Sequence, residues 1–146
     1  MSRTINFHSE GIDYSPTLPH LDNWLSLLLT DVGNRSTWSI NYIFCDDSYL
    51  HKINVEYLSH DTYTDIITFP LEVNAQHIGA DIFISIDRVK DNASQFNVEF
   101  DKELLRVMAH GILHLVGYQD KSEDDMVVMR TAENSAISKY YDDTVQ

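Results

Sequence analysis

The sequence contains little cysteine, proline or glycine. Its 146 residues include one Cys, 3 Pro and 5 Gly. Because a single thiol cannot close a disulfide within the chain, Cys45 favours a reducing compartment and is best interpreted as a small buried apolar residue. No repeat, Pro-rich segment or Gly/Ser-rich linker indicates a domain boundary, and the length suits a single hydrophobic core. We therefore expect one domain that spans residues 1–146.

Long hydrophobic runs are also missing. The densest apolar stretch, residues 24–29, is interrupted by Ser26 and is far shorter than the roughly 20 residues that a membrane-spanning helix needs. Residues 1–8 are too polar to form the apolar core of a signal peptide. The sequence thus predicts a cytoplasmic protein with no membrane segment.

Basic residues are scarce relative to acidic ones. The chain has 10 Lys and Arg against 23 Asp and Glu, which gives a formal net charge of −13. This balance argues against nucleic-acid binding through many phosphate contacts and against binding to an anionic membrane surface. Residues 101–118 are the exception, because their two acids and two bases sum to zero. RNA can be a partner if a local feature such as a bound cation attracts it.

The periodicity of apolar residues predicts helices interspersed with strands. Residues 21–32 have apolar side chains at helical spacing, with a stop signal at Gly33, and residues 38–44 alternate as in a strand with one buried face. Similar patterns predict strands over 4–7, 64–69 and 80–86, and helices over 46–57, 87–96, 99–116 and 122–140. The strand over 64–69 should end at Pro70. The expected class is α+β, with a small mixed β-sheet packed against about five helices.

One segment carries residues suited to metal binding. His110 and His114 are four residues apart in the expected helix, so their imidazoles lie on one face, at the edge of the apolar side. Gly117 allows the chain to turn back, which brings Asp120 within reach as an oxygen ligand. Three such ligands with a fourth position open to water are typical of a catalytic zinc site on a helix and the following turn. For the histidine pair alone, two unrelated polar residues at a helix edge are the alternative.

Residues 110–118, His-Gly-Ile-Leu-His-Leu-Val-Gly-Tyr, closely resemble the signature of the YbeY family of bacterial metal-dependent endoribonucleases, also called rRNA maturation factors. Further blocks are similar to those of the family and follow in the same order. They are Ile53-Asn54 with Tyr57, then Asp61, then residues 64–70 (Thr-Asp-Ile-Ile-Thr-Phe-Pro), then Asp81-Ile82 with Ile84-Ser85. The resemblance extends over residues 37–141, which makes it far more specific than a zinc motif alone.

The resemblance implies an α+β fold, one zinc ion per chain and hydrolysis of single-stranded RNA by water activated on that metal. It also implies a role in 3′-end maturation of small-subunit ribosomal RNA, in rRNA processing and in ribosome quality control, with the small ribosomal subunit and a ribosomal protein as partners. His110 and His114 would act through the metal. Two positions depart from the family pattern. Asp120 replaces a third histidine, and Leu58 replaces an arginine suited to phosphate binding.

Other cations would then have to contact the substrate. The candidates are Lys121, His60 and Arg106, and for each the alternative is a solvated surface charge. The candidates for lining the cleft are Asp65, Thr68 and Tyr118, and their alternatives are a turn or cap residue, an ordinary strand residue and a packing residue.

Two other functions fit parts of the pattern. The spacing of His110, His114 and Asp120 is also that of metzincin-like zinc proteases, but these have a catalytic glutamate where this chain has Gly111. A non-catalytic ribosome assembly factor with a zinc site is the third possibility. Leu58 and the acidic composition favour it, because both weaken the case for phosphate binding.

Overall fold

The computed structural model describes residues 2–60 and 62–142. In this part of the chain, four strands and five α-helices confirm the expected α+β class, and α1 continues into one π-helical turn, η1. The elements are β1 (Arg3–Glu10), α1 (Leu21–Leu27), η1 (Leu28–Val32), β2 (Thr37–Cys45), α2 (Asp47–Leu58), β3 (Ile66–Val73), β4 (His77–Ser85), α3 (Ile86–Phe96), α4 (Phe100–Leu115) and α5 (Glu123–Tyr141).

The strands form one mixed sheet in the order β1-β2-β4-β3. β1, β2 and β4 are parallel, whereas β3 pairs with β4 in the antiparallel direction. The predicted alternation in β2 is confirmed, because one face of this strand is buried along its whole length. The residues of that face are Trp38, Ile40, Tyr42 and Phe44.

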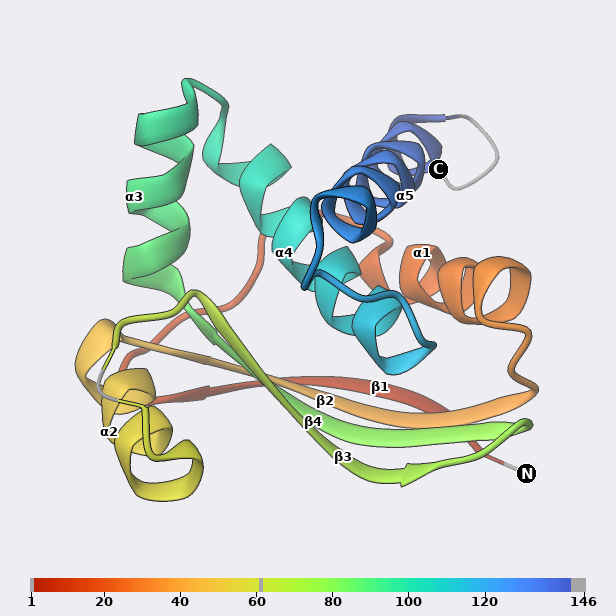
Figure 1. Cartoon of the computed structure of the whole chain (residues 1–146), viewed down its shortest axis with the longest axis horizontal. Helices are drawn as coiled ribbons and strands as arrows, with labels where there is room; N and C mark the ends of the chain where they lie inside the picture. Colours follow the sequence, from red (N-terminus) through yellow and green to blue (C-terminus); the bar gives the residue numbers. More distant parts are fainter. Residues whose placement is uncertain (1, 61, 143–146) are drawn as a thin grey trace.

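Helices cover the two faces of the sheet unequally. Figure 1 shows α1, α4 and α5 above one face, with α4 between the sheet and α5, and α2 at one end of the other face. Buried hydrogen bonds join these layers: the Tyr42 hydroxyl donates to the Met108 carbonyl at 2.8 Å, and the Trp24 indole donates to the Ala136 carbonyl at 2.8 Å. Packing against the sheet on one side and against α5 on the other therefore holds α4 in a fixed position.

The helix caps follow the sequence signals. The Asp46 carboxylate accepts from the Tyr49 amide at 2.8 Å and begins α2, while Ser122 and Asp125 form a capping box at the start of α5. The helix expected from residue 87 begins one residue earlier, because the Ser85 side chain caps it.

The prediction that Pro70 ends a strand is wrong. β3 continues to Val73, and its register with β4 shifts between Pro70 and Glu72. Proline is tolerated here because β3 is an edge strand and because the irregularity in register directly after Pro70 interrupts the ladder with β4.

Two expectations about buried and membrane segments can be compared with the structure. Cys45 is fully buried, and burial raises the pKa of its thiol to about 12, which suits a packing role.

Within residues 2–60 and 62–142, no helix is both long and apolar enough to cross a bilayer.

Candidate metal centre

The two histidines lie on α4 one turn apart. His110 is half-buried, with 21% of its side chain exposed, whereas His114, near the end of the helix, is exposed. Between them, Gly111 faces the sheet, where a Cβ atom would lie 3.1 Å from Ile66 Cδ1 and 3.3 Å from Ile82 Cδ1. A glycine at this position therefore lets α4 approach the sheet closely, which brings the histidines next to the start of β3.

The turn after α4 brings the third candidate ligand back toward the helix. Gly117 has φ +114°, a conformation that side chains rarely adopt, and the Tyr118 amide donates to the Leu113 carbonyl at 2.9 Å. As a result, Asp120 Oδ2 lies 3.7 Å from His110 Nε2. The structure thus places the Asp120 carboxylate beside the His110 ring.

A cavity of about 350 Å³ lies between α4, the start of β3 and this turn. It contains His110, His114 and Asp120, together with three other residues singled out from the sequence, Asp65, Thr68 and Arg106. Of the residues that the structure describes, those lining the cavity are Thr64, Asp65, Ile66, Thr68, Arg106, Val107, His110, His114 and Asp120.

Behind the cavity wall lies a cluster of buried charges centred on Arg106. Its guanidinium donates to both Glu103 oxygens, with 2.9 Å from Nε to Oε1, and lies 3.5 Å from Glu133 and 3.6 Å from Asp65. Only 2% of the Glu103 and Glu133 side chains is exposed. Burial alone would lower the pKa of Arg106, but the hydrogen bonds and charges of these carboxylates raise it.

Glu133 was not expected from the sequence. It extends from α5, and its Oε2 lies 2.7 Å from His110 Nδ1. A signal for it exists, since Glu133 shares the buried face of α5 with Met129, Ile137 and Tyr140, where a carboxylate is out of place unless it has a partner.

Asp65 faces the cavity from the segment that leads into β3. Asn92 donates to its Oδ2 at 3.2 Å. Burial raises the pKa of Asp65, and the charges of Arg106 and His110 offset only part of this effect. The Asp65 carboxyl therefore holds a proton more strongly than an ordinary aspartate.

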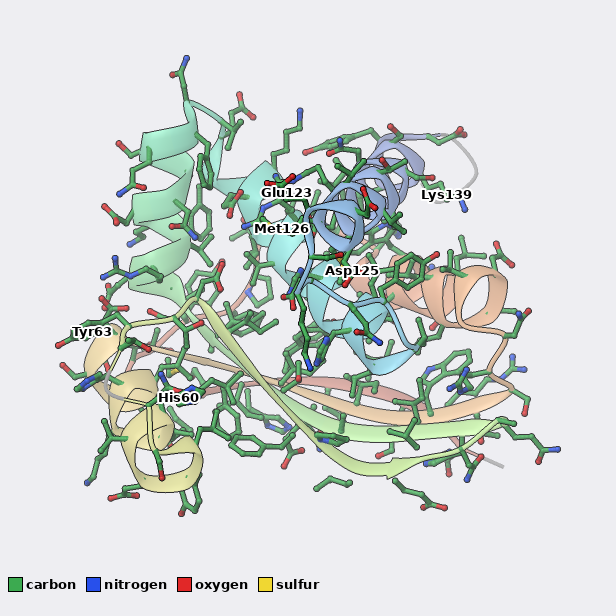
Figure 2. The ribbon with its side chains drawn as sticks, in the orientation of Figure 1. His60, Tyr63, Glu123, Asp125, Met126 and Lys139 are labelled. Atoms are coloured by element: carbon green, nitrogen blue, oxygen red, sulfur yellow. The ribbon has the colours of Figure 1, made fainter. Side chains whose placement is uncertain are left out.

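The other candidates lie outside the cavity lining. Lys121 and His60 are exposed, and Figure 2 shows His60 beside α2. Tyr118 packs at the rim of the main core and lines a separate hollow with Gly117 and Val116. Leu58, at the position of the family's arginine, ends α2 with 40% exposure. Asp61, one of the family blocks, lies outside the described residues.

The donor set suits zinc, although the ligands are not gathered tightly. Among residues 2–60 and 62–142, no three His, Cys, Asp or Glu side chains form a ready cluster for a metal ion. Two ligands on one tetrahedral zinc ion lie about 3.3 Å apart, given bonds of about 2.0–2.1 Å. The 3.7 Å between His110 Nε2 and Asp120 Oδ2 is close to this spacing, and His114 lines the same cavity. Two imidazoles and a carboxylate are chemically suitable ligands.

A family model and several curated relatives name the same family for this chain. A family model described as "Endoribonuclease YbeY" matches residues 5–141. Proteins named endoribonuclease YbeY from Flavobacterium johnsoniae and Christiangramia forsetii are 54% and 45% identical to this chain over 137 residues, which is 94% of this chain and 97% and 94% of theirs. The solution structure of TM1509 from Thermotoga maritima is similar with a TM-score of 0.60 and 26% identity, and covers 94% of this chain and 89% of that one.

Proposed function

Because the chain belongs to the endoribonuclease YbeY family, we propose that it hydrolyses single-stranded ribosomal RNA in the cavity beside α4, with residues 1–146 acting as one domain. The observation that carries this proposal is the presence of His110, His114 and Asp120 around one cavity. The family resemblance suggests the 3′ end of small-subunit ribosomal RNA as the target, in rRNA processing and ribosome quality control. It also suggests the small ribosomal subunit and one of its proteins as partners, which would place the protein in the cytoplasm.

We assign zinc to this site, held by His110, His114 and Asp120. When bound, zinc supplies a Lewis acid that lowers the pKa of water to about 7 and polarises a phosphoryl oxygen. The two imidazoles project from one helix face and the carboxylate from the following turn, so all three border the same cavity, where the substrate would bind. Asp120 contributes a negatively charged oxygen ligand where the family usually has a neutral histidine, and a carboxylate is an ordinary ligand of zinc.

The remaining polar residues of the cavity act on the substrate in this proposal. The Thr68 hydroxyl donates a hydrogen bond to a phosphate or sugar oxygen, and the Asp65 carboxyl exchanges a proton with the attacking water, since its pKa is raised by burial. Tyr118, outside the lining, would contact RNA only beyond the cavity.

Phosphate contacts are expected to be few. Among the described residues that line the cavity, Arg106 is the one lysine or arginine, and its guanidinium is already paired with buried carboxylates. Lys121, next to Asp120 in the chain, and the more distant His60 would meet only flanking phosphates. RNA affinity should therefore depend weakly on salt.

Cleavage of a single-stranded ribosomal RNA fragment by the full chain with added zinc tests the proposal. We expect the wild type to cut this RNA and to leave a matched duplex intact, and we expect His114→Ala or a chelator to abolish cutting. His8→Ala is the matched control, because His8 is exposed on β1, at the opposite edge of the sheet from β3, and its loss should leave the rate unchanged. Full activity in His114→Ala would contradict the proposal.

The other two functions predict different results. In a metzincin-like protease the residue after the first histidine is a glutamate that faces the metal, but here Gly111 is pressed against Ile66 and Ile82, so this position cannot present a base to the cavity. Casein hydrolysis would revive that function. If the protein is instead a non-catalytic assembly factor, it will cosediment with small ribosomal subunits and leave RNA uncut.

A further inference from the structure

We propose that Glu133 is a positioning residue that fixes the ring of His110 for metal binding. The two side chains come from different helices, α5 and α4, and meet at 2.7 Å between Oε2 and Nδ1. Glu133 is buried and His110 is half-buried with its other nitrogen, Nε2, toward Asp120. The inference rests on the proposed function, because it gives Glu133 a role only if His110 binds a metal.

The second oxygen of Glu133 explains why this carboxylate keeps a single orientation. Oε1 lies 3.5 Å from the Arg106 guanidinium and 3.7 Å from that of Arg130. Two cations thus contact Oε1, and neither of these contacts involves Oε2. With Oε1 directed at two positive charges, Oε2 is left to accept from His110.

The hydrogen bond to Glu133 determines which nitrogen of His110 carries its proton. The 2.7 Å contact assigns the proton of His110 to Nδ1, where the ring N–H donates and the Glu133 oxygen accepts. In this tautomer the lone pair is on Nε2, 3.7 Å from Asp120 Oδ2 and beside the cavity. In this way a residue 23 positions further along the chain prepares His110 as a nitrogen ligand.

Glu133→Gln tests the assignment, and Glu103→Gln is its matched control. Both glutamates have 2% of the side chain exposed and both pair with Arg106, but only Glu133 is bonded to a proposed ligand. The first measurement is the affinity of the metal-free full chain for Zn²⁺ and for Co²⁺, with the Co²⁺ absorption spectrum as a report of ligand geometry. The second is the ¹⁵N chemical shifts of His110, which distinguish protonation at Nδ1 from protonation at Nε2.

We expect Glu133→Gln to weaken metal binding about 10- to 100-fold and Glu103→Gln to weaken it less than about threefold, because loss of a contact to a ligand acts on the site directly. In the metal-free wild type and in Glu103→Gln, the ¹⁵N shifts should show the proton on Nδ1. Equal loss of affinity in both variants would overturn the proposal, and so would a wild-type proton on Nε2. The wild-type measurement decides the question even if Glu133→Gln does not fold.

The proposed function and this inference can fail separately. If the wild type binds no metal and cuts no RNA, both are wrong. If the wild type binds zinc and cuts RNA while Glu133→Gln does so equally well, only the role of Glu133 is wrong.

Discussion

Two arginines on adjacent helices are each surrounded by carboxylates, but in different environments. Arg88, on α3, pairs with Asp47 at 2.5 Å and with Asp91 at 3.1 Å, and its side chain is 31% exposed. Arg106, on α4, pairs with Glu103 and Glu133, and is only 14% exposed. The first cluster joins α2 to α3 at the surface, whereas the second lies behind the candidate metal centre.

The difference indicates that the two clusters serve different purposes. An ion pair at the surface contributes little to stability and is screened by salt. A buried cluster has a desolvation cost that its attraction hardly offsets, so its presence is poor support for a stabilising role. The Arg106 cluster is better explained by what it holds in place, namely Glu133 beside His110.

The largest effect is expected from Arg106→Met. The substitution leaves Glu103 and Glu133 buried without their shared cation, and breaking a buried pair in this way costs about 3–5 kcal/mol of unfolding free energy. Urea denaturation of the metal-free protein at neutral pH measures the loss. A loss below about 1 kcal/mol would mean that this cluster behaves like a surface one.

Replacing the whole cluster should have a smaller effect on the unfolding free energy than Arg106→Met has. A variant with Arg106→Met, Glu103→Met and Glu133→Met removes both fully buried carboxylates together with their shared cation, while Asp65, which is 23% exposed, keeps its hydrogen bond from Asn92. We expect its unfolding free energy to return to the wild-type value or to exceed it by about 1–4 kcal/mol. The same protein should bind zinc weakly, since His110 has lost its acceptor. If it instead stays as unstable as Arg106→Met alone, the cluster is needed for folding and not only for the site.

Arg88→Met should have a still smaller effect. Because the pair with Asp47 is partly exposed, we expect a loss of about 0.2–1 kcal/mol that shrinks as salt is added. Urea denaturation at low and high NaCl measures both, and Lys90→Met on the same helix is a control for loss of charge. A loss as large as that of Arg106→Met would remove the contrast between the clusters.

Much of the fold, and the placement of the two histidines of the site, could be predicted because local patterns determine them. Alternation in β2, helical spacing in α4 and the cap at Ser122 depend on residues close in the chain. The spacing of His110 and His114 likewise follows from the helix alone. Pro70 misled the prediction because its tolerance depends on β3 being an edge strand, which is a property of the whole sheet.

The surroundings of His110 could not be predicted because they are brought together from distant segments. Arg106 meets Asp65 and Glu133 only after α4 has packed between the sheet and α5. In the sequence Arg106 is indistinguishable from a solvated charge on a helix face. The buried face of α5 offered the one available hint, a glutamate at helical spacing between Met129 and Ile137.

The two clusters should also differ in how their aspartates couple stability to pH, and this is the smallest effect. Partial burial would raise the pKa of Asp47, but hydrogen bonds from Arg88 and Ser85 lower it below 3.8, so its contribution is present above that pH and is lost as the pH falls further. Burial raises the pKa of Asp65, so the folded state binds its proton more strongly than the unfolded state does, and stability falls as the pH rises from 3.8 through the folded pKa.

Each aspartate can be removed separately. Asp65→Asn should flatten the decline above pH 3.8, and Asp47→Asn should flatten the loss below it, by about 1.4 kcal/mol for each pH unit that separates the folded pKa from the unfolded one. Urea denaturation of the metal-free chain between about pH 3 and pH 7 measures both slopes. If Asp65→Asn instead leaves the decline above pH 3.8 unchanged and flattens the loss below it, as Asp47→Asn should, the carboxyl is stabilised as an anion by Arg106, and the buried cluster resembles the exposed one after all.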